Sequence, residues 1–137
     1  MKKVLFASSF SALLVICLLF SSCSKEQLTL NKLAGDWQYT TIKLLGISVD
    51  PATLGYTSAN LHFDLCKANV QRCGGVQTLN GTANNFQYEL SEDAKTVSVY
   101  NATGGTDTYT IISVDKSNLV YTMVISGVTY EFTLKKI

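Results

Sequence analysis

The chain has 137 residues, 47% of them hydrophobic, and its 11 Lys or Arg and 10 Asp or Glu residues give a formal net charge of +1 at pH 7. Neither the basic nor the acidic residues are clustered along the sequence, whereas phosphate recognition needs a concentrated basic face. Nucleic acids and acidic lipid surfaces are therefore not expected as partners.

The first 22 residues have the pattern of a lipoprotein signal peptide. A charged start, Met1-Lys2-Lys3, precedes an apolar run over residues 4–20 that several serines interrupt. This run is too short to hold a helix across about 30 Å of hydrocarbon, so it indicates secretion rather than a membrane span. Residues 18–23, Leu-Leu-Phe-Ser-Ser-Cys, resemble a bacterial lipobox, in which small residues precede a cysteine that receives diacylglycerol.

Cys23 is accordingly predicted to be the lipidated first residue of the mature protein. Two or more acyl chains, at about 0.8 kcal/mol per buried methylene, would hold the protein on the outer membrane through this residue. The alternative is ordinary signal cleavage that leaves Cys23 as an unmodified thiol. Residues 24–27 partly resemble the tags of surface-displayed lipoproteins, so the periplasmic and the cell-surface face of the membrane both remain open.

The mature chain begins with a linker over residues 23–32, of which residues 27 onward form a short helix or turn. The first strand is expected from residue 35 to about residue 45. Residues 46–59 contain the only proline and several Ser and Thr residues, and are predicted to form a long loop. Such loops often serve as lids or binding loops, although a plain connection is the equal alternative.

Seven further strands are expected from the alternation of polar and apolar residues between turn residues. They cover residues 60–65, 76–79, 85–90, 95–100, 106–114, 119–126 and 128–135. In the first of them, Leu61, Phe63 and Leu65 face inward, which leaves His62 and Asp64 together on the solvent side.

Eight antiparallel strands in sequence order, joined mostly by short turns, close into an up-and-down barrel, and closure removes exposed strand edges. The fold class is therefore all-β, with a single barrel domain over residues 33–137. A β-sandwich is the alternative, but it usually needs Greek-key crossovers rather than hairpins between neighbours.

The stretch Leu-Ala-Gly-Asp-Trp at residues 33–37, at the head of this all-β chain, resembles the first-strand signature of lipocalin-like (calycin) barrels. The short form of these barrels is common among envelope lipoproteins of Bacteroidota. In that family the tryptophan plugs one end of the barrel, and a basic residue of the last strand packs over it. The resemblance assigns these roles to Gly35, Trp37 and either Lys135 or Lys136, with Lys135 as the signature residue.

Cys66 and Cys73 are the even pair that remains once Cys17 leaves with the signal peptide and Cys23 takes lipid. In an oxidising compartment they are predicted to form a disulfide. Closing a loop of this length stabilises a fold by about 2.5 kcal/mol in the chain-entropy model. A metal site with His62 is the alternative, but it lacks a fourth ligand. No metal or cofactor is predicted.

Many of the inward positions are aromatic. An eight-stranded barrel is just wide enough for side chains to fill it or for one small ligand to occupy it. A pocket of this composition suits an apolar molecule with one or two polar groups. The inward set also includes Met123 and Phe132, and its candidate ligand-binding residues are Tyr39, Phe63, Phe86, Tyr88, Tyr109, Tyr121 and Tyr130.

No constellation typical of an enzyme is present. The chain has a single histidine, no Gly-x-Ser-x-Gly elbow, no phosphate-binding glycine loop and no inward pair of carboxylates. The resemblance favours an outer-membrane lipoprotein that binds a small hydrophobic molecule in its barrel. The alternative is an interaction module, either an inhibitor or an assembly subunit, whose barrel interior is filled.

Overall fold

The computed structural model describes residues 24–137. The predicted signal peptide and the predicted lipidation site, Cys23, lie outside this range. No helix within it is long and apolar enough to cross a bilayer. Its elements are α2 Lys25–Leu33, β1 Gly35–Leu44, β2 Ile47–Val49, the 3-10 helix η1 Pro51–Leu54, β3 Ala59–Phe63, β4 Cys73–Leu79, β5 Thr82–Leu90, β6 Thr96–Asn101, β7 Thr106–Val114, β8 Asn118–Ile125 and β9 Val128–Lys136.

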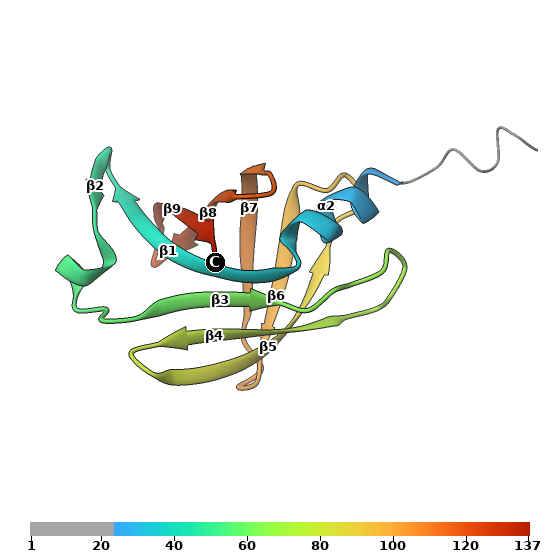
Figure 1. The fold of residues 1–137 in the computed structure, drawn as a ribbon, viewed down its shortest axis with the longest axis horizontal. Coiled ribbons are helices and arrows are strands. Elements are labelled where there is room, and N and C mark those ends of the chain that lie inside the picture. Colours follow the sequence, from blue (N-terminus) through green and yellow to red (C-terminus); the bar gives the residue numbers. More distant parts are fainter. Residues whose placement is uncertain (1–23) are drawn as a thin grey trace, which may run out of the picture.

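All strand pairs are antiparallel, and consecutive strands from β3 to β9 are neighbours (Figure 1). Strand β1 closes the ring because it pairs with β9 on one side and with both β3 and β2 on the other. Its first half, residues 35–38, pairs with β3, and residues 42–44 pair with β2. Since β2 and β3 share one place in the ring, the nine strands form an eight-stranded barrel. The predicted all-β up-and-down barrel is confirmed.

The predicted loop over residues 46–59 is wrong in part. Leu45 and Gly46 have positive φ values of 50° and 82° and form a tight turn that sends the chain back along β1 as β2. The side chain of Asp50 then accepts a hydrogen bond from the Ala52 amide at 2.8 Å and caps η1. A three-residue strand carries too little alternation to be recognised in the sequence, and β1 supplies its pairing.

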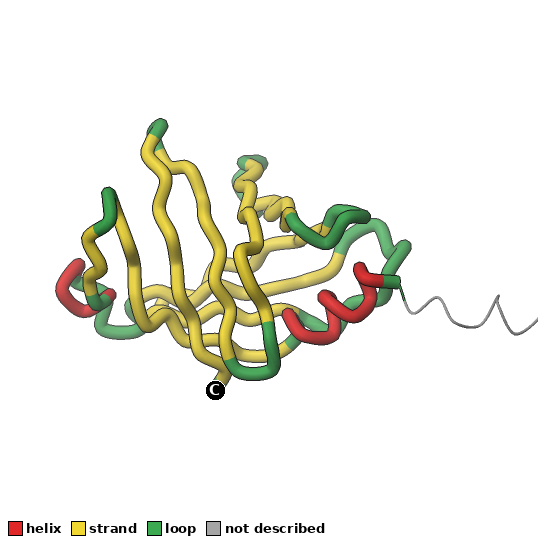
Figure 2. Tube along the Cα trace, turned by 90° about the horizontal axis from the view of Figure 1, so that it is seen from above, coloured by secondary structure: helices red, strands yellow, loops and turns green. Residues whose placement is uncertain are grey.

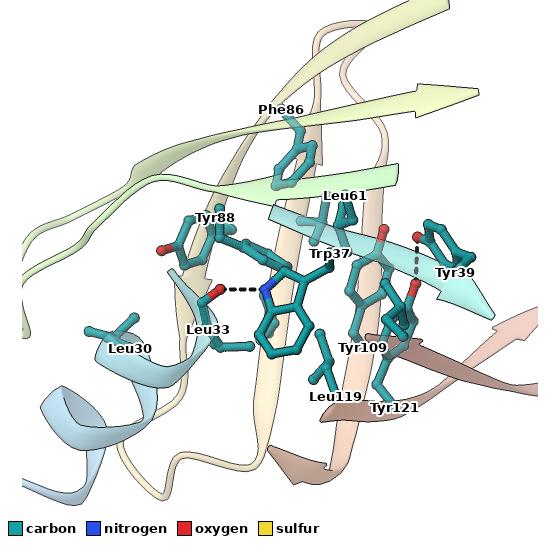
Figure 3. Packing of buried hydrophobic residues seen from close by; sticks show 14 of the residues in the cluster. Leu30, Leu33, Trp37, Tyr39, Leu61, Phe86, Tyr88, Tyr109, Leu119 and Tyr121 are labelled. Atoms are coloured by element: carbon teal, nitrogen blue, oxygen red, sulfur yellow. Dashed lines mark hydrogen bonds between the residues drawn. The ribbon is translucent and has the colours of Figure 1, made fainter. Parts of the chain in front are cut away.

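Helix α2 closes one end of the barrel, where both the N-terminal and the C-terminal parts of the described chain lie (Figures 1 and 2). Ser24 caps the helix: its hydroxyl accepts a hydrogen bond from the amide of Gln27, and this satisfies one of the free N–H groups of the first turn. Leu30 and Leu33 pack from the helix into the core against Trp37, which is fully buried (Figure 3). The first described element is therefore part of the core.

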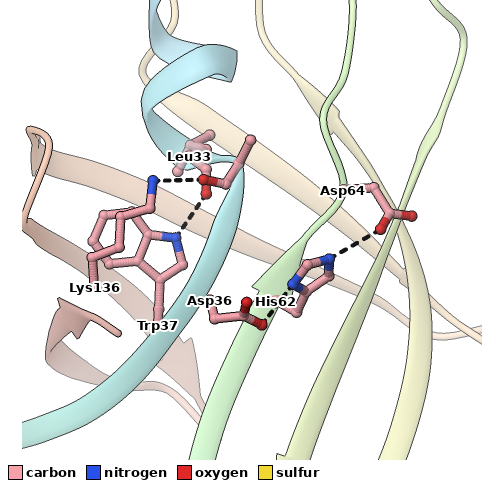
Figure 4. Close-up of polar contacts among 7 residues, drawn as sticks. Leu33, Asp36, Trp37, His62, Asp64 and Lys136 are labelled. Carbon is pink, nitrogen blue, oxygen red and sulfur yellow. Dashed lines mark hydrogen bonds and ion pairs between the residues drawn. The ribbon is translucent and has the colours of Figure 1, made fainter.

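Trp37 is held by the last strand as well as by the helix. Its indole N–H donates to the carbonyl of Leu33 at 2.7 Å, and the Lys136 ammonium lies 4.9 Å from the centre of the indole ring (Figure 4). The same ammonium donates to the carbonyls of Ala34 at 2.6 Å and Lys32 at 3.2 Å. We call this arrangement the terminal clasp.

The basic residue over Trp37 is therefore Lys136 rather than the expected Lys135. Side chains alternate between the faces of a strand, so one of two adjacent lysines faces away from the indole, and Lys135 is exposed. Gly35 has a φ of 113°, and a Cβ atom there would lie 2.9 Å from Cε of Lys136. This position needs glycine for its backbone conformation and for the close approach of the lysine.

Leu65 was expected to face inward but is 76% exposed. Strand β3 ends at Phe63, so the alternation stops before Leu65. The next buried position is Cys66, which is 5% exposed.

Candidate ligand site at the barrel mouth

The barrel is open at the end opposite α2, and its wall is split there. Strand β7 pairs with β6 through residues 106–110 but with β8 only from Thr110 onward. The first residues of β7 and the last residues of β8, 123–125, share no pairing. A β-bulge between Ile111 and Ser113 lies next to this split. The open end therefore has a gap in its hydrogen-bonded wall, which we call the mouth.

A cavity of about 170 Å³ lies inside the mouth. Residues from both sides of the split line it, including Asp107 and Tyr109 from β7 and Met123 and Ile125 from β8. Most of its other lining residues are apolar or aromatic. This volume is close to that of an engineered cavity of about 150 Å³ that binds benzene. The cavity is thus large enough for about one ring.

Polar groups in the lining of this cavity belong to Gln77, Asp107 and four tyrosines, of which Tyr39, Tyr109 and Tyr121 are buried. The hydroxyls of Tyr39 and Tyr121 share a hydrogen bond of 2.8 Å (Figure 3), and the Gln77 amide donates to the Tyr39 hydroxyl at 3.2 Å. Tyr109 stacks on Tyr121 with ring centres 4.5 Å apart and planes 15° apart. Burial raises the pKa of all three phenols above 10, so they are neutral at physiological pH and keep their protons as hydrogen-bond donors.

A wider apolar groove of about 570 Å³ adjoins the cavity at the rim. It lies between the β1–β2 hairpin and the β8–β9 hairpin, and it shares Ile42, Tyr56, Ile125 and Phe132 with the cavity. Its remaining lining is almost entirely aliphatic and includes Leu45 and Ile47, which are 84% and 68% exposed. Four of its ten lining residues lie in the segment 46–59, which the sequence analysis predicted to be either a binding loop or a plain connection.

The seven candidate ligand-binding residues fall into three groups. Tyr39, Tyr109 and Tyr121 line the mouth cavity, and Tyr130 lines the rim groove. Phe63, Phe86 and Tyr88 instead pack against one another in the core, with centres of the Phe63 and Tyr88 rings 4.9 Å apart.

Tyr88 does not line the mouth cavity or the rim groove, because its hydroxyl donates to the carbonyl of Asp64 at 2.8 Å near the closed end. Burial raises the pKa of this phenol to about 12. Phe63 is likewise absent from both linings, and Phe86 lines a different hollow on the outside of the barrel.

That outer hollow, of about 550 Å³, has walls of mixed polarity. The Arg72 guanidinium covers the ring of Tyr100 at 3.7 Å and pairs with Glu89 at 3.2 Å. The Tyr100 hydroxyl also donates to Glu89, at 2.8 Å. The side chains of Arg72, Tyr100 and Glu89 are therefore bound to one another.

Cys66 and Cys73 lie at disulfide-bonding distance, with Cα atoms 5.8 Å apart, as predicted. Their loop is at the closed end, where the Gln27 side chain of α2 donates to the Cys66 carbonyl and accepts from the Ala68 amide. Within residues 24–137, no three His, Cys, Asp or Glu side chains are arranged to hold a metal ion.

His62 and Asp64 share the solvent face, as predicted, and the register of β1 with β3 adds Asp36 beside them. The two imidazole nitrogens lie 2.7 Å from an Asp36 oxygen and 3.1 Å from an Asp64 oxygen (Figure 4). Because both nitrogens have carboxylate partners, neither is free to act as a base on a substrate. The sequence analysis did not place Asp36 beside this pair.

Comparison with known proteins adds no assignment. No model of a protein family matches the chain, and a search of curated proteins also finds no match. The fold and the mouth are therefore the features from which a function can be inferred.

Proposed function

We propose that this chain is a lipid-anchored, lipocalin-like protein of the bacterial cell envelope that binds a small hydrophobic molecule at the mouth of its barrel. The observation that carries the proposal is the mouth cavity of about 170 Å³ with the adjoining rim groove of about 570 Å³. The groove alone lies within the range of about 300 to 1,000 Å³ that is typical of small-molecule sites. Such sites are mostly apolar with a few polar groups, as this mouth is.

The placement of the helix is compatible with a lipid anchor on Cys23. Helix α2 begins directly after Ser24, at the closed end of the barrel. An acyl anchor on the preceding residue would attach at that end. The mouth, at the opposite end, would then stay accessible to molecules in the surrounding solution. The outer membrane is the proposed location, on either its periplasmic or its surface face.

The rim also gives one reason to keep the interaction module as a second candidate. Leu45, Ile47 and Ile125 of the rim groove are 84%, 68% and 40% exposed, and exposed apolar residues that lie together often mark a contact site for another protein. In this second function the core remains filled and the rim packs against an envelope partner.

Native mass spectrometry tests the proposal on protein released gently from envelope membranes, with the denatured mass taken alongside. We expect an adduct of low molecular mass that is retained in the native state and lost on denaturation. Met123→Trp, which puts a larger side chain into the cavity, should abolish the adduct. Ile112→Trp, at a position that is 58% exposed, is the matched control and should retain it. An empty monomer for the unmodified protein would contradict ligand binding and favour the interaction module.

A further inference from the structure

We infer that the mouth selects a neutral apolar molecule that carries a carbonyl group, and that tyrosine hydroxyls of the cavity bind this carbonyl. The inference rests on the proposed function and specifies the class of ligand. Two observations support it: hydroxyl hydrogens in the cavity lack an acceptor within residues 24–137, and a carboxylate with no cation beside it lines the same cavity.

The Tyr39–Tyr121 pair has one hydroxyl hydrogen too many for its own contacts. The two phenols have two hydroxyl hydrogens, and the bond between them uses one, whichever oxygen donates. The Gln77 amide donates to Tyr39 and so takes no hydrogen from the pair. Within residues 24–137 the remaining hydroxyl hydrogen has no acceptor. The pair therefore presents one free donor to a ligand.

Tyr109 presents a second free donor. Its hydroxyl makes no hydrogen bond to any residue of the range 24–137, although its ring is only 6% exposed. Among the described side chains, the single polar atom that is fully buried without a partner is Oδ1 of Asn60. The Tyr109 hydroxyl also lacks a partner among the described residues but is not one of the fully buried atoms. It is therefore exposed to the cavity that Tyr109 lines. Figure 3 shows Tyr39, Tyr109 and Tyr121 gathered on one side of the buried cluster.

A hydrogen-bond acceptor on the ligand would satisfy these donors. Buried donors that lack an acceptor are costly, so a molecule that supplies one gains affinity over an otherwise equal hydrocarbon. A carbonyl oxygen has two lone pairs and can accept from both hydroxyls at once. The apolar remainder of the molecule would then extend along the rim groove past residues such as Leu44, Ile47 and Tyr130.

Charge at the cavity disfavours a carboxylate in the same place. Asp107 lines the cavity, and one of its oxygens accepts from the Asn101 amide at 2.8 Å. After burial, the negative charge of Asp107 is among the causes that raise the pKa of Tyr109 and Tyr121. None of the residues that line the cavity is Lys, Arg or His, so no cation offsets this charge. A fatty acid in its ionised form would be repelled, whereas a ketone, ester or quinone would not.

The test compares three ligands of one medium chain length by calorimetric titration at pH 8: a methyl ketone, the matching carboxylate and the matching alkane. The disulfide-bonded chain of residues 24–137 is suitable, because the barrel, its core and the terminal clasp lie within that range. We expect the ketone to bind about tenfold more tightly than either of the other two ligands, since two new hydrogen bonds can supply about 1.4 kcal/mol.

Variants then assign the effect to the cavity. Tyr109→Phe, and the double variant Tyr39→Phe with Tyr121→Phe, each remove one free donor and should lower the ratio of ketone affinity to alkane affinity about threefold to tenfold. Retained alkane binding shows that the variants remain folded. Tyr100→Phe, which lines neither the mouth cavity nor the rim groove, is the matched control and should leave the ratio of the two affinities unchanged. Asp107→Asn should raise the affinity for the carboxylate.

The outcomes separate this inference from the proposed function. Equal binding of the three ligands would overturn the inference, because water would then accept the hydroxyl hydrogens as well as the carbonyl does. The proposed binding of a hydrophobic molecule would still be supported. Preference for the carboxylate would also overturn it. If the unmodified chain binds none of the three, the proposed function fails together with the inference.

Discussion

Lys136 is the side chain on which the terminal clasp depends. We predict that Lys136→Met lowers the free energy of unfolding by about 1 to 2 kcal/mol, because two carbonyls lose a charged donor and the indole loses its cation. Lys135→Met is the matched control, and an exposed position of this kind should change stability by less than about 0.5 kcal/mol. Urea unfolding followed by Trp37 fluorescence measures both. Equal effects of the two substitutions would mean that the clasp adds no stability.

His62 makes stability depend on pH. Partial burial lowers the pKa of His62, but the hydrogen bonds and charges of Asp36 and then Asp64 outweigh this, and the net pKa is raised above 6.5. The folded state therefore binds the proton more tightly than the unfolded state. The resulting stabilisation is fully present below about pH 6.5 and is lost as the pH rises through the raised pKa of the folded state.

His62→Gln provides the measurement. We expect the difference in unfolding free energy between the unmodified protein and this variant to shrink as the pH is raised from below 6.5 into the mildly alkaline range. Urea titrations at a series of pH values give this difference. A difference that stays constant across the window would show that the two carboxylates do not hold the proton on the imidazole.

At the scale of the element, two adjacent glycines of β4 differ in what surrounds them. A Cβ atom at Gly75 would overlap the ring of Phe86 and lie 2.8 Å from the carbonyl oxygen of His62, which belongs to the β3 backbone. A Cβ atom at Gly74 would meet only the carboxylate of Asp64, an exposed group that can rotate away.

We therefore predict that Gly75→Ala destabilises the fold by about 1 to 3 kcal/mol, as overpacking of a core does. Gly74→Ala should change stability by less than about 0.5 kcal/mol. Thermal and urea unfolding of the two variants provide the comparison. A neutral Gly75→Ala would mean that β4 can shift relative to β3 and β5, contrary to the packing described above.

The strands that sequence analysis located best are those with several alternations and clear turns, such as β5 to β9. Two local departures were not predictable from alternation. A bulge in β1 between Tyr39 and Thr41 changes which positions face inward, so that Ile42 lines the cavity. At Leu65 the chain had already left the sheet, and an alternating pattern does not reveal where pairing ends.

At the scale of the whole molecule, the barrel was predictable but the position of its ligand site was predictable only in part. Alternation indicates which residues face the interior, and by this criterion Tyr39, Tyr88 and Phe63 are alike. It does not indicate how far along the barrel axis a residue lies. Tyr39 reaches the mouth, whereas Tyr88 and Phe63 pack at the closed end. That depth depends on strand register, which turns and bulges determine.

The pairing of the first strand with the last has a consequence for the order of folding. Lys136 reaches the carbonyl of Ala34 across 102 positions of the sequence. Contacts between such distant positions form slowly, and an unpaired strand edge can associate with another chain in the meantime. During synthesis from the N-terminus, the edge of β1 has no β9 partner until residues 128–136 have been made. The appearance of β9 therefore ends the period in which this edge of the first strand is open to aggregation.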